Sequence, residues 1–254
     1  MLALELTGKR ALVTGGSRGV GRAIARSLAR AGADVFITFH QRVDDAAATV
    51  RELTELGVES GMWGGDLADS GAVRTMFEAV DRAFSSRLDI FVGNAGIWPP
   101  QDVPVAAMSD EQWRRTLAVN LDAMFYTTRG AAQRLGDAGR VVLIGSTAGQ
   151  RGEAGHADYA ASKGALISFV KGIAIELAPR GITVNCVAPG WIDTEMASAP
   201  YVGGGRERIE AMIPLGRVAS VEDVAGPVTF LCSALARHIT GEVLNVNGGA
   251  VLCG

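Results

Sequence analysis

The chain has 254 residues and a net charge of −3, and its composition, 48% hydrophobic and 20% charged, excludes a disordered or low-complexity protein. Lys and Arg are scattered without forming a basic stripe, so we expect no nucleic-acid partner. No apolar run reaches the roughly 18 residues that span a bilayer, and the first residues lack a signal-peptide pattern, so we expect a cytoplasmic protein with no membrane partner.

Short apolar runs alternate with longer segments of helical periodicity along the whole chain. In chain order the pattern predicts a strand over residues 10–14, a helix over 21–31, a strand over 34–39, a helix over 44–56, a weaker strand over 58–63, a helix over 70–85, a strand over 88–93, a helix over 110–135, a strand over 140–144, a helix over 159–179, a strand over 182–187, a helix over 221–235 and a strand over 243–246. We expect a capping box of Ser109 with Gln112 before the fourth helix, and an N-cap at Ser220 with Asp223 before the sixth.

Most of these strands are apolar on both faces, as the central strands of a parallel sheet are. Their alternation with helices predicts one α/β domain over residues 1–254, with a doubly wound parallel sheet of about seven strands and helices on both faces. The stretches 97–108 and 191–214 escape the alternation. Ligands of such sheets bind at the carboxyl ends of the strands, where these loops emerge, so both are candidates to cover a substrate.

The three cysteines do not form a recognisable site. Cys186, Cys232 and Cys253 are far apart and have neither CxxC nor Cys/His ligand spacing, so the sequence predicts no disulfide and no metal centre. We expect Cys186 and Cys232 to be small residues of the core.

The first strand runs directly into the glycine-rich stretch TGGSRGVG, residues 14–21, and then into a helix. This context presents backbone N–H groups and a helix N-terminus to a pyrophosphate, and Gly15, Gly19 and Gly21 permit close approach of the backbone. A plain tight turn is the alternative. The context favours dinucleotide binding.

The spacing TGxxxGxG resembles the shorter, about 250-residue branch of the short-chain dehydrogenase/reductase family, which implies a Rossmann fold. Later motifs agree with this resemblance in order and placement. They are Asn94-Ala95-Gly96 after a strand, Asn120 within a helix, Ser146 after the next strand, the YxxxK pair of Tyr159 and Lys163, and Pro189-Gly190 after a further strand.

The end of the second strand indicates which dinucleotide is bound. An NAD site usually places an acidic residue there, but none lies between Val35 and Val43. A 2′-phosphate would meet no repelling carboxylate, and Arg18, His40 and Arg42 supply donors and positive charge. We therefore favour NADP(H) over NAD(H); the alternative is that both arginines are solvated surface charges.

The remaining cofactor contacts follow from the resemblance. Asp66 would hydrogen-bond the adenine amino group, although it could instead cap the following helix; the backbone near Ile192 would face the carboxamide, and Thr194 would reach a phosphate. The complete set of expected contacts is Gly15, Ser17, Arg18, Gly19, Val20, Gly21, His40, Arg42, Asp66, Leu67, Asn94, Ala95, Gly96, Tyr159, Lys163, Pro189, Gly190, Ile192 and Thr194.

Tyr159 and Lys163 lie four residues apart in a helical segment and so project from one face. A tyrosine has a pKa near 10, which we expect the neighbouring ammonium and an oxidised nicotinamide to lower. The phenol would then act as general acid in reduction and as general base in oxidation. The resemblance adds that Lys163 holds the nicotinamide ribose.

The resemblance completes the catalytic set of Asn120, Ser146, Tyr159 and Lys163. Ser146 would hydrogen-bond the substrate oxygen, and Asn120 would hold a water that extends the proton relay. Taken singly, each has an ordinary structural role, such as a turn serine or a solvent-facing asparagine. His156, three residues before the tyrosine, is expected at the surface and stays outside the set.

The substrate is defined only as a ketone or a secondary alcohol. The chain resembles 3-oxoacyl-[acyl-carrier-protein] reductases in particular, so a 3-oxoacyl thioester is one candidate. An acyl carrier protein is a doubtful partner, however, because Gln133 and Ile175 stand where carrier-docking reductases have basic residues, although Arg129 and Arg134 are nearby. Alternative functions are an NAD-dependent alcohol or sugar dehydrogenase, an epimerase or dehydratase, and a dinucleotide-binding regulator without turnover.

The helix that carries Tyr159 also suggests self-association. It is rich in small residues, which permit close helix packing: Ala160, Ala161, Gly164 and Ala165. Family members commonly pair this helix across a dimer axis and form tetramers, so the resemblance implies a homotetramer.

Overall fold

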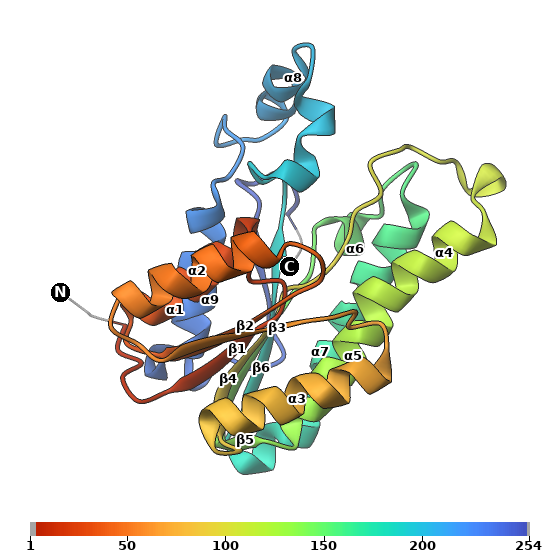
Figure 1. Cartoon of the computed structure of the whole chain (residues 1–254). Coiled ribbons are helices and arrows are strands. Elements are labelled where there is room, and N and C mark those ends of the chain that lie inside the picture. Colours follow the sequence, from red (N-terminus) through yellow and green to blue (C-terminus); the bar gives the residue numbers. More distant parts are fainter. Residues whose placement is uncertain (1–3, 253–254) are drawn as a thin grey trace.

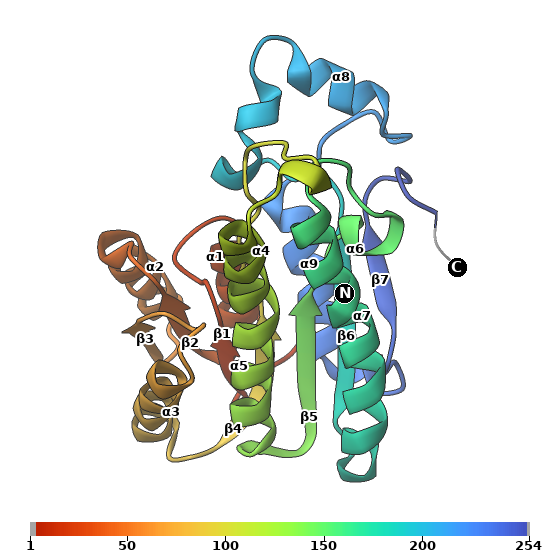
Figure 2. The ribbon, with the colours of Figure 1, turned by 90° about the vertical axis from the view of Figure 1, so that its right-hand side faces the viewer.

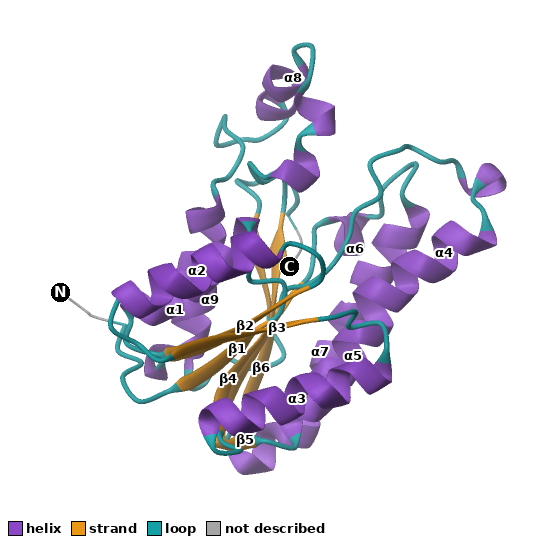
Figure 3. Ribbon diagram, in the orientation of Figure 1, coloured by secondary structure: helices purple, strands orange, loops and turns teal. Residues whose placement is uncertain are grey.

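The computed structural model describes residues 4–252, and within them seven parallel strands form one sheet in the order β3-β2-β1-β4-β5-β6-β7 (Figures 1 and 3). The strands are β1 Arg10–Val13, β2 Asp34–Phe39, β3 Ser60–Gly64, β4 Leu88–Gly93, β5 Leu135–Ile144, β6 Thr183–Pro189 and β7 Val243–Val246. Strands β2 and β3 lie on one side of β1, whereas β4 to β7 lie on its other side. The connections after β1 and β4 therefore diverge, which creates a crevice at the carboxyl ends of these two strands. The predicted doubly wound Rossmann fold is confirmed.

Helices cover both faces of the sheet, as Figure 1 shows. They are α1 Gly19–Arg30, α2 Val43–Glu55, α3 Ser70–Phe84, α4 Asp110–Leu117, α5 Ala123–Ala132, α6 Ala148–Arg151, α7 Ala157–Leu177, α8 Gly205–Ala211 and α9 Val221–Cys232. One core packs α1, α2 and α9 on the sheet with Ile24 and Val228 at its centre. The other packs α3, α5 and α7 on the opposite face with Phe77 and Leu166.

The burial of each strand explains how clearly its apolar pattern appears in the sequence. All seven residues of β6 are buried, and five of them are apolar or cysteine; the polar Asn185 is hydrogen-bonded to the Ile239 carbonyl oxygen and the Glu242 N–H. The edge strand β3 is only partly covered, and its signal was correspondingly weak. Cys186 on β6 and Cys232 on α9 are 0% and 3% exposed, so their prediction as core residues is confirmed, while Cys253 lies outside the described residues.

The long helix predicted over 110–135 is wrong in one respect, because a π turn, Ala118–Asp122, separates α4 from α5. A π turn inserts one residue into the helical repeat, and an apolar periodicity of 3.6 does not reveal it. The strand predicted from residue 140 also begins earlier, at Leu135, and passes through Ala138 with a φ of +60°.

Ser109 and Ser220 both cap helices, as predicted, but the capping box lies at Ser220 and not at Ser109. Ser109 accepts a hydrogen bond from the Gln112 backbone at 3.1 Å, but the Gln112 side chain donates to Asp158 at 3.2 Å and so does not return to the cap. The complete capping box is that of Ser220 and Asp223 at the start of α9. A buried acceptor on α7 therefore outcompetes the exposed cap for the glutamine amide.

Both unassigned stretches rise above the carboxyl ends of the strands (Figure 2). Residues 97–108 include a short 3₁₀ turn, Val105–Ala107, and residues 191–214 include two further turns, Glu195–Ala197 and Ala199–Tyr201, followed by α8. The 191–214 segment is tied to the body at its base, where Ile192 pairs with Ala219. Within residues 4–252, no helix has the length and apolar character needed to traverse a bilayer.

Candidate active site

The glycine-rich turn between β1 and α1 has the geometry of an anion site. Gly15 and Gly19 have φ values of +68° and +52°, which L side chains rarely adopt. A Cβ on Gly21 would lie 2.1 Å from the Gly15 carbonyl oxygen, so only glycine fits there. The N-cap residue Arg18 is extended and its side chain makes no cap hydrogen bond. The first N–H groups of α1 are therefore free to bind a phosphate.

Asn94 joins the ends of β1 and β4 beneath this turn. Its side chain donates to the carbonyl oxygens of Thr14 at 2.9 Å and Gly15 at 3.3 Å, and its backbone N–H donates to the Thr14 hydroxyl at 2.9 Å. Asn94 therefore lines the crevice while its amide group fixes the turn.

Ser146, Tyr159 and Lys163 converge from two elements. Ser146 follows β5 and hydrogen-bonds Tyr159, and Lys163 lies one turn further along α7, with its Nζ 5.8 Å from the centre of the tyrosine ring. The Lys163 ammonium is buried and donates to the Ile144 carbonyl oxygen at 2.8 Å. This convergence is what the sequence predicts.

The electrostatics of the pair are dominated by burial. Burial raises the pKa of Tyr159 to about 12, the charge of Glu153 raises it further, and the hydrogen bond with Ser146 opposes both. Burial likewise lowers the pKa of Lys163 to about 8. Without the dinucleotide, desolvation of the phenolate dominates and the lysine donates to a backbone carbonyl. The lowering of the tyrosine pKa expected with an oxidised nicotinamide stays a prediction.

Asn120 is fully buried on the π turn and does not line the crevice. Its Oδ1 accepts from the Ile97 N–H at 2.8 Å, and its Nδ2 donates to the Ile97 carbonyl at 2.9 Å and the Ser162 hydroxyl at 3.2 Å. A Cβ on Gly96 would lie 3.0 Å from Asn120 Oδ1 and 3.6 Å from Lys163 Nζ, so glycine permits this packing. The ordinary role of a solvent-facing asparagine is wrong for this residue.

Asp66 lines the crevice, and its Oδ1 accepts from the Ala68 N–H at 2.9 Å. The residue that caps α3 is Asp69, whose side chain accepts from the Gly71 N–H at 2.7 Å. The alternative role of Asp66 as the helix cap is therefore wrong.

His156 is buried, with only 2% of its surface exposed, so the expectation of a surface position is wrong. Its ring stacks on Trp98 at 4.5 Å, and its Nε2 lies 2.8 Å from the Pro99 carbonyl oxygen. Because a carbonyl only accepts, Nε2 carries the proton. Glu153 lies 3.8 Å from His156 Nδ1, hydrogen-bonds Trp98 and has a pKa raised by burial.

The glycine turn, Asp66, Ser146, Tyr159 and Lys163 share one crevice of about 550 Å³. It runs from the glycine turn, past the carboxyl ends of β1 and β4, to Tyr159 beneath the 97–108 and 191–214 segments. Every expected cofactor contact lines it: Gly15, Ser17, Arg18, Gly19, Val20, Gly21, His40, Arg42, Asp66, Leu67, Asn94, Ala95, Gly96, Tyr159, Lys163, Pro189, Gly190, Ile192 and Thr194.

Comparisons with known proteins agree with this geometry. The family model described as enoyl-(acyl carrier protein) reductase matches residues 15–251. The 3-oxoacyl-[acyl-carrier-protein] reductase of Escherichia coli is 40% identical over 248 residues, which cover 97% of this chain and 98% of that protein. The chain belongs to the short-chain dehydrogenase/reductase family. As a member it is an NAD(P)-dependent oxidoreductase that acts on a CH–OH group.

Solved structures of family members superpose closely on the chain. A short-chain dehydrogenase from Burkholderia cenocepacia in complex with NADP is 41% identical with a TM-score of 0.91, and the match covers 97% of this chain and 99% of that one. A blue fluorescent protein from a metagenomic library in complex with NADPH is 38% identical with the same TM-score, covering 98% and 100%.

The structure adds residues to the crevice that the short-chain dehydrogenase/reductase motifs do not mark. Among them are Trp98, Arg115, Arg151, Glu153, Trp191, Glu195 and Met196. Four of these seven come from the two segments that the sequence left unassigned, so their approximate location was foreseeable. Their identities as lining residues depend on loop conformations that carry no motif.

Proposed function

We propose that the protein is an NADP(H)-dependent ketoreductase that interconverts a ketone and a secondary alcohol, with Tyr159 as the proton donor and acceptor. The observation that carries this proposal is the convergence of Ser146, Tyr159 and Lys163 in a crevice whose far end holds Arg18 and Arg42. The bound NADP and NADPH of the two solved relatives support it.

The residues of the chain fit the cofactor end to end. The free N–H groups of α1 would hold the pyrophosphate, Arg18 and Arg42 the 2′-phosphate, and Lys163 the nicotinamide ribose. When bound, the dinucleotide supplies or accepts a hydride at the substrate carbon.

The proton chemistry belongs to the chain itself. In reduction the Ser146 hydroxyl donates a hydrogen bond to the substrate oxygen, and Tyr159 transfers its phenol proton as negative charge develops on that oxygen. A pKa of about 12 keeps the phenol protonated at neutral pH, so it is available as the proton donor in reduction. Asn120 acts behind the site by fixing the backbone at Ile97.

Tyr159→Phe tests this function against a dinucleotide-binding regulator. The variant should bind NADPH as the wild type does, because the phenol oxygen contributes little to that affinity, and should lose carbonyl-dependent NADPH oxidation across a panel of ketones. Tryptophan fluorescence titration and absorbance at the NADPH band measure the two properties. Undiminished turnover would refute the proposal.

The basic residues near the expected carrier-docking positions are engaged elsewhere, which supports a small substrate. Arg134 forms a 2.7 Å ion pair with Asp81, and the Arg129 guanidinium lies 4.9 Å from the centre of the Phe125 ring. Ile175, at one of the docking positions, is 77% exposed. We expect free ketones or short thioesters to react without a carrier protein.

Exposed apolar side chains on α5 and α7 support a homotetramer, with residues 1–254 acting as one dinucleotide-binding and catalytic domain in each subunit. Phe125 and Ile175 are 42% and 77% exposed, which is unusual for large apolar residues on neighbouring helices. Sedimentation equilibrium should give four times the chain mass of 26.4 kDa; a monomer at micromolar concentration would refute this assembly.

A further inference from the structure

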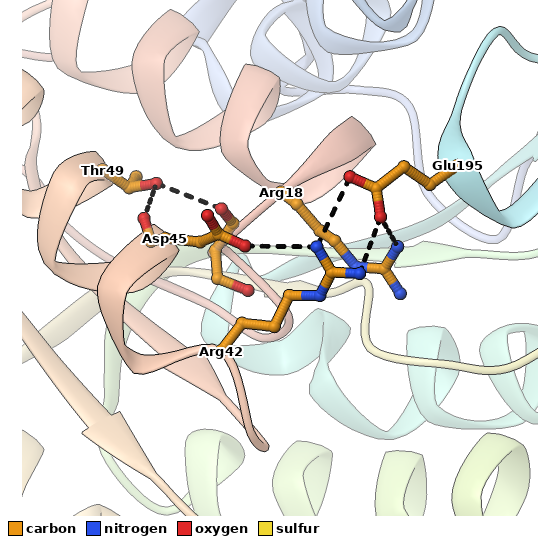
Figure 4. A network of polar contacts seen from close by, with 6 residues as sticks. Arg18, Arg42, Asp45, Thr49 and Glu195 are labelled. Carbon is orange, nitrogen blue, oxygen red and sulfur yellow. Dashed lines mark hydrogen bonds and ion pairs between the residues drawn. The ribbon is translucent and has the colours of Figure 1, made fainter.

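A carboxylate occupies the place where the 2′-phosphate is expected. Glu195 lies in the 3₁₀ turn at the start of the 191–214 segment. It forms ion pairs with Arg18 and Arg42, at the end of the crevice where the adenosine of the cofactor would bind (Figure 4). Its Oε2 lies 2.8 Å from Arg18 Nη1 and 2.8 Å from Arg42 Nη2, and its Oε1 accepts from Arg42 Nη1 at 3.4 Å. One anion thus satisfies two guanidinium groups that come from different elements.

We infer that Glu195 competes with the 2′-phosphate of NADP(H), so that the cofactor must displace this carboxylate from Arg18 and Arg42 before its phosphate binds there. The inference rests on the proposed preference for NADP(H). It assigns Glu195 as a residue that sets dinucleotide selectivity, and it implies that binding of the phosphate releases the turn Glu195–Ala197 from the two arginines.

Charge balance in the cluster favours the displacement. Arg42 also contacts Asp45 at 3.3 Å, so two guanidinium groups face two carboxylates and the cluster is formally neutral. A dianionic phosphate gains less from a neutral cluster than from a positive one, and it is repelled by a carboxylate at hydrogen-bond distance from the same donors. Once Glu195 leaves, one net positive charge and the donors of both arginines are available.

The surroundings allow Glu195 to leave. Its side chain is 60% exposed, so it can turn into solvent without burying charge. The other ion pairs of the segment are internal, since Arg206 contacts Asp193 at 2.8 Å and Glu210 at 3.1 Å. The base of the segment is held separately, by the hydrogen bond from Asp193 N–H to the Ala219 carbonyl at 2.9 Å. Further along the segment, Ile209 and Ile213 are buried against Val218, whose N–H donates to Glu210 at 3.4 Å. Loss of the Glu195 contacts therefore frees only the start of the segment, around the turn Glu195–Ala197.

Glu195→Gln tests the inference, with Glu207→Gln as the matched control on α8 of the same segment. Fluorescence titration should show that Glu195→Gln binds NADPH about threefold to tenfold more tightly than the wild type, as expected for the loss of a competing exposed ion pair. Affinity for NADH should stay within twofold, and the control should match the wild type for both cofactors. The gain should shrink at high salt, which screens exposed charges.

A second readout uses adenosine 2′,5′-bisphosphate, which carries the 2′-phosphate but no nicotinamide. It should speed amide hydrogen exchange over residues 195–198 in the wild type, whereas adenosine 5′-monophosphate should not, and Glu195→Gln should exchange rapidly there without either ligand. Unchanged or weaker NADPH binding by Glu195→Gln, or exchange that ignores the bisphosphate, overturns the inference while leaving the proposed function intact. A wild type that binds NADH as tightly as NADPH overturns both.

Discussion

The two arginines at the adenosine end should carry most of the discrimination between NADPH and NADH. Arg18 and Arg42 converge on one oxygen atom at 2.8 Å each, so a single phosphate can contact both. Charge-assisted hydrogen bonds contribute about 1.5–3 kcal/mol when shielded, and exposed ion pairs up to about 1 kcal/mol. With the side chains 42% and 49% exposed, an intermediate value of about 1–1.5 kcal/mol each is appropriate.

Displacing Glu195 costs about 1 kcal/mol of this gain. The Arg18→Ala/Arg42→Ala double variant should therefore lose about 1–2 kcal/mol of NADPH binding, a weakening of about 5- to 30-fold. NADH binding should change by less than threefold. Arg26→Ala is the matched control, because Arg26 lies on α1, pairs with Glu52 and does not line the crevice. Fluorescence titrations at two salt concentrations measure the effect, which should be smaller at the higher one. Equal losses for both cofactors would refute the reasoning, since the arginines would then act through the fold.

Three further perturbations test the site and its supports. Glu153→Gln removes a charge that raises the Tyr159 pKa, so alcohol oxidation, which needs the phenolate, should begin to rise at lower pH in a pH–rate profile. Asn120→Ala leaves the buried polar groups of Ile97 without partners and should cost about 1–3 kcal/mol in urea unfolding, with a lower kcat. Gly21→Ala should cost about 1–3 kcal/mol and weaken both dinucleotides, because its Cβ would overlap the turn.

Matched controls separate these effects from general damage. Gly172→Ala adds a methyl group to α7 where nothing lies within 4 Å, so it should leave dinucleotide binding unchanged. Asn120→Asp keeps the oxygen that accepts from Ile97 and should recover part of the stability lost with alanine. A profile for Glu153→Gln that moves to higher pH would show that the carboxylate does not act on Tyr159 through its charge.

The features predictable from sequence were those encoded over short stretches. Tyr159 and Lys163 are one helical turn apart, and Gly15, Gly19 and Gly21 belong to one turn, so local geometry alone places each group. The doubly wound parallel arrangement follows from the alternation of strands and helices and from general rules of chain connection. The core assignment of Cys186 is likewise local, because the residue lies within a short, mostly apolar run.

The features that were missed depend on contacts between distant residues. Gln112 donates to Asp158, 46 positions away, and this contact decides against the expected capping box. The raised pKa of Tyr159 is a property of burial, which motifs do not state. His156 is buried because the 97–108 segment returns over it and places Trp98 on its ring. In each case the sequence showed the type of residue but not the distant residues that surround it in the fold.

Cofactor selectivity also depends on both local sequence features and contacts between distant residues. Arg18 and Arg42 are adjacent to recognisable motifs, and they suggest a phosphate without reference to the rest of the chain. The anion they hold in the structure comes from Glu195, 153 positions beyond Arg42. The affinity for a 2′-phosphate is set by the interactions that the phosphate forms with the arginines minus those that it must first break. Glu195 therefore makes the preference for NADPH over NADH weaker than the two arginines alone would suggest. A neutral residue at this position should make the preference stronger.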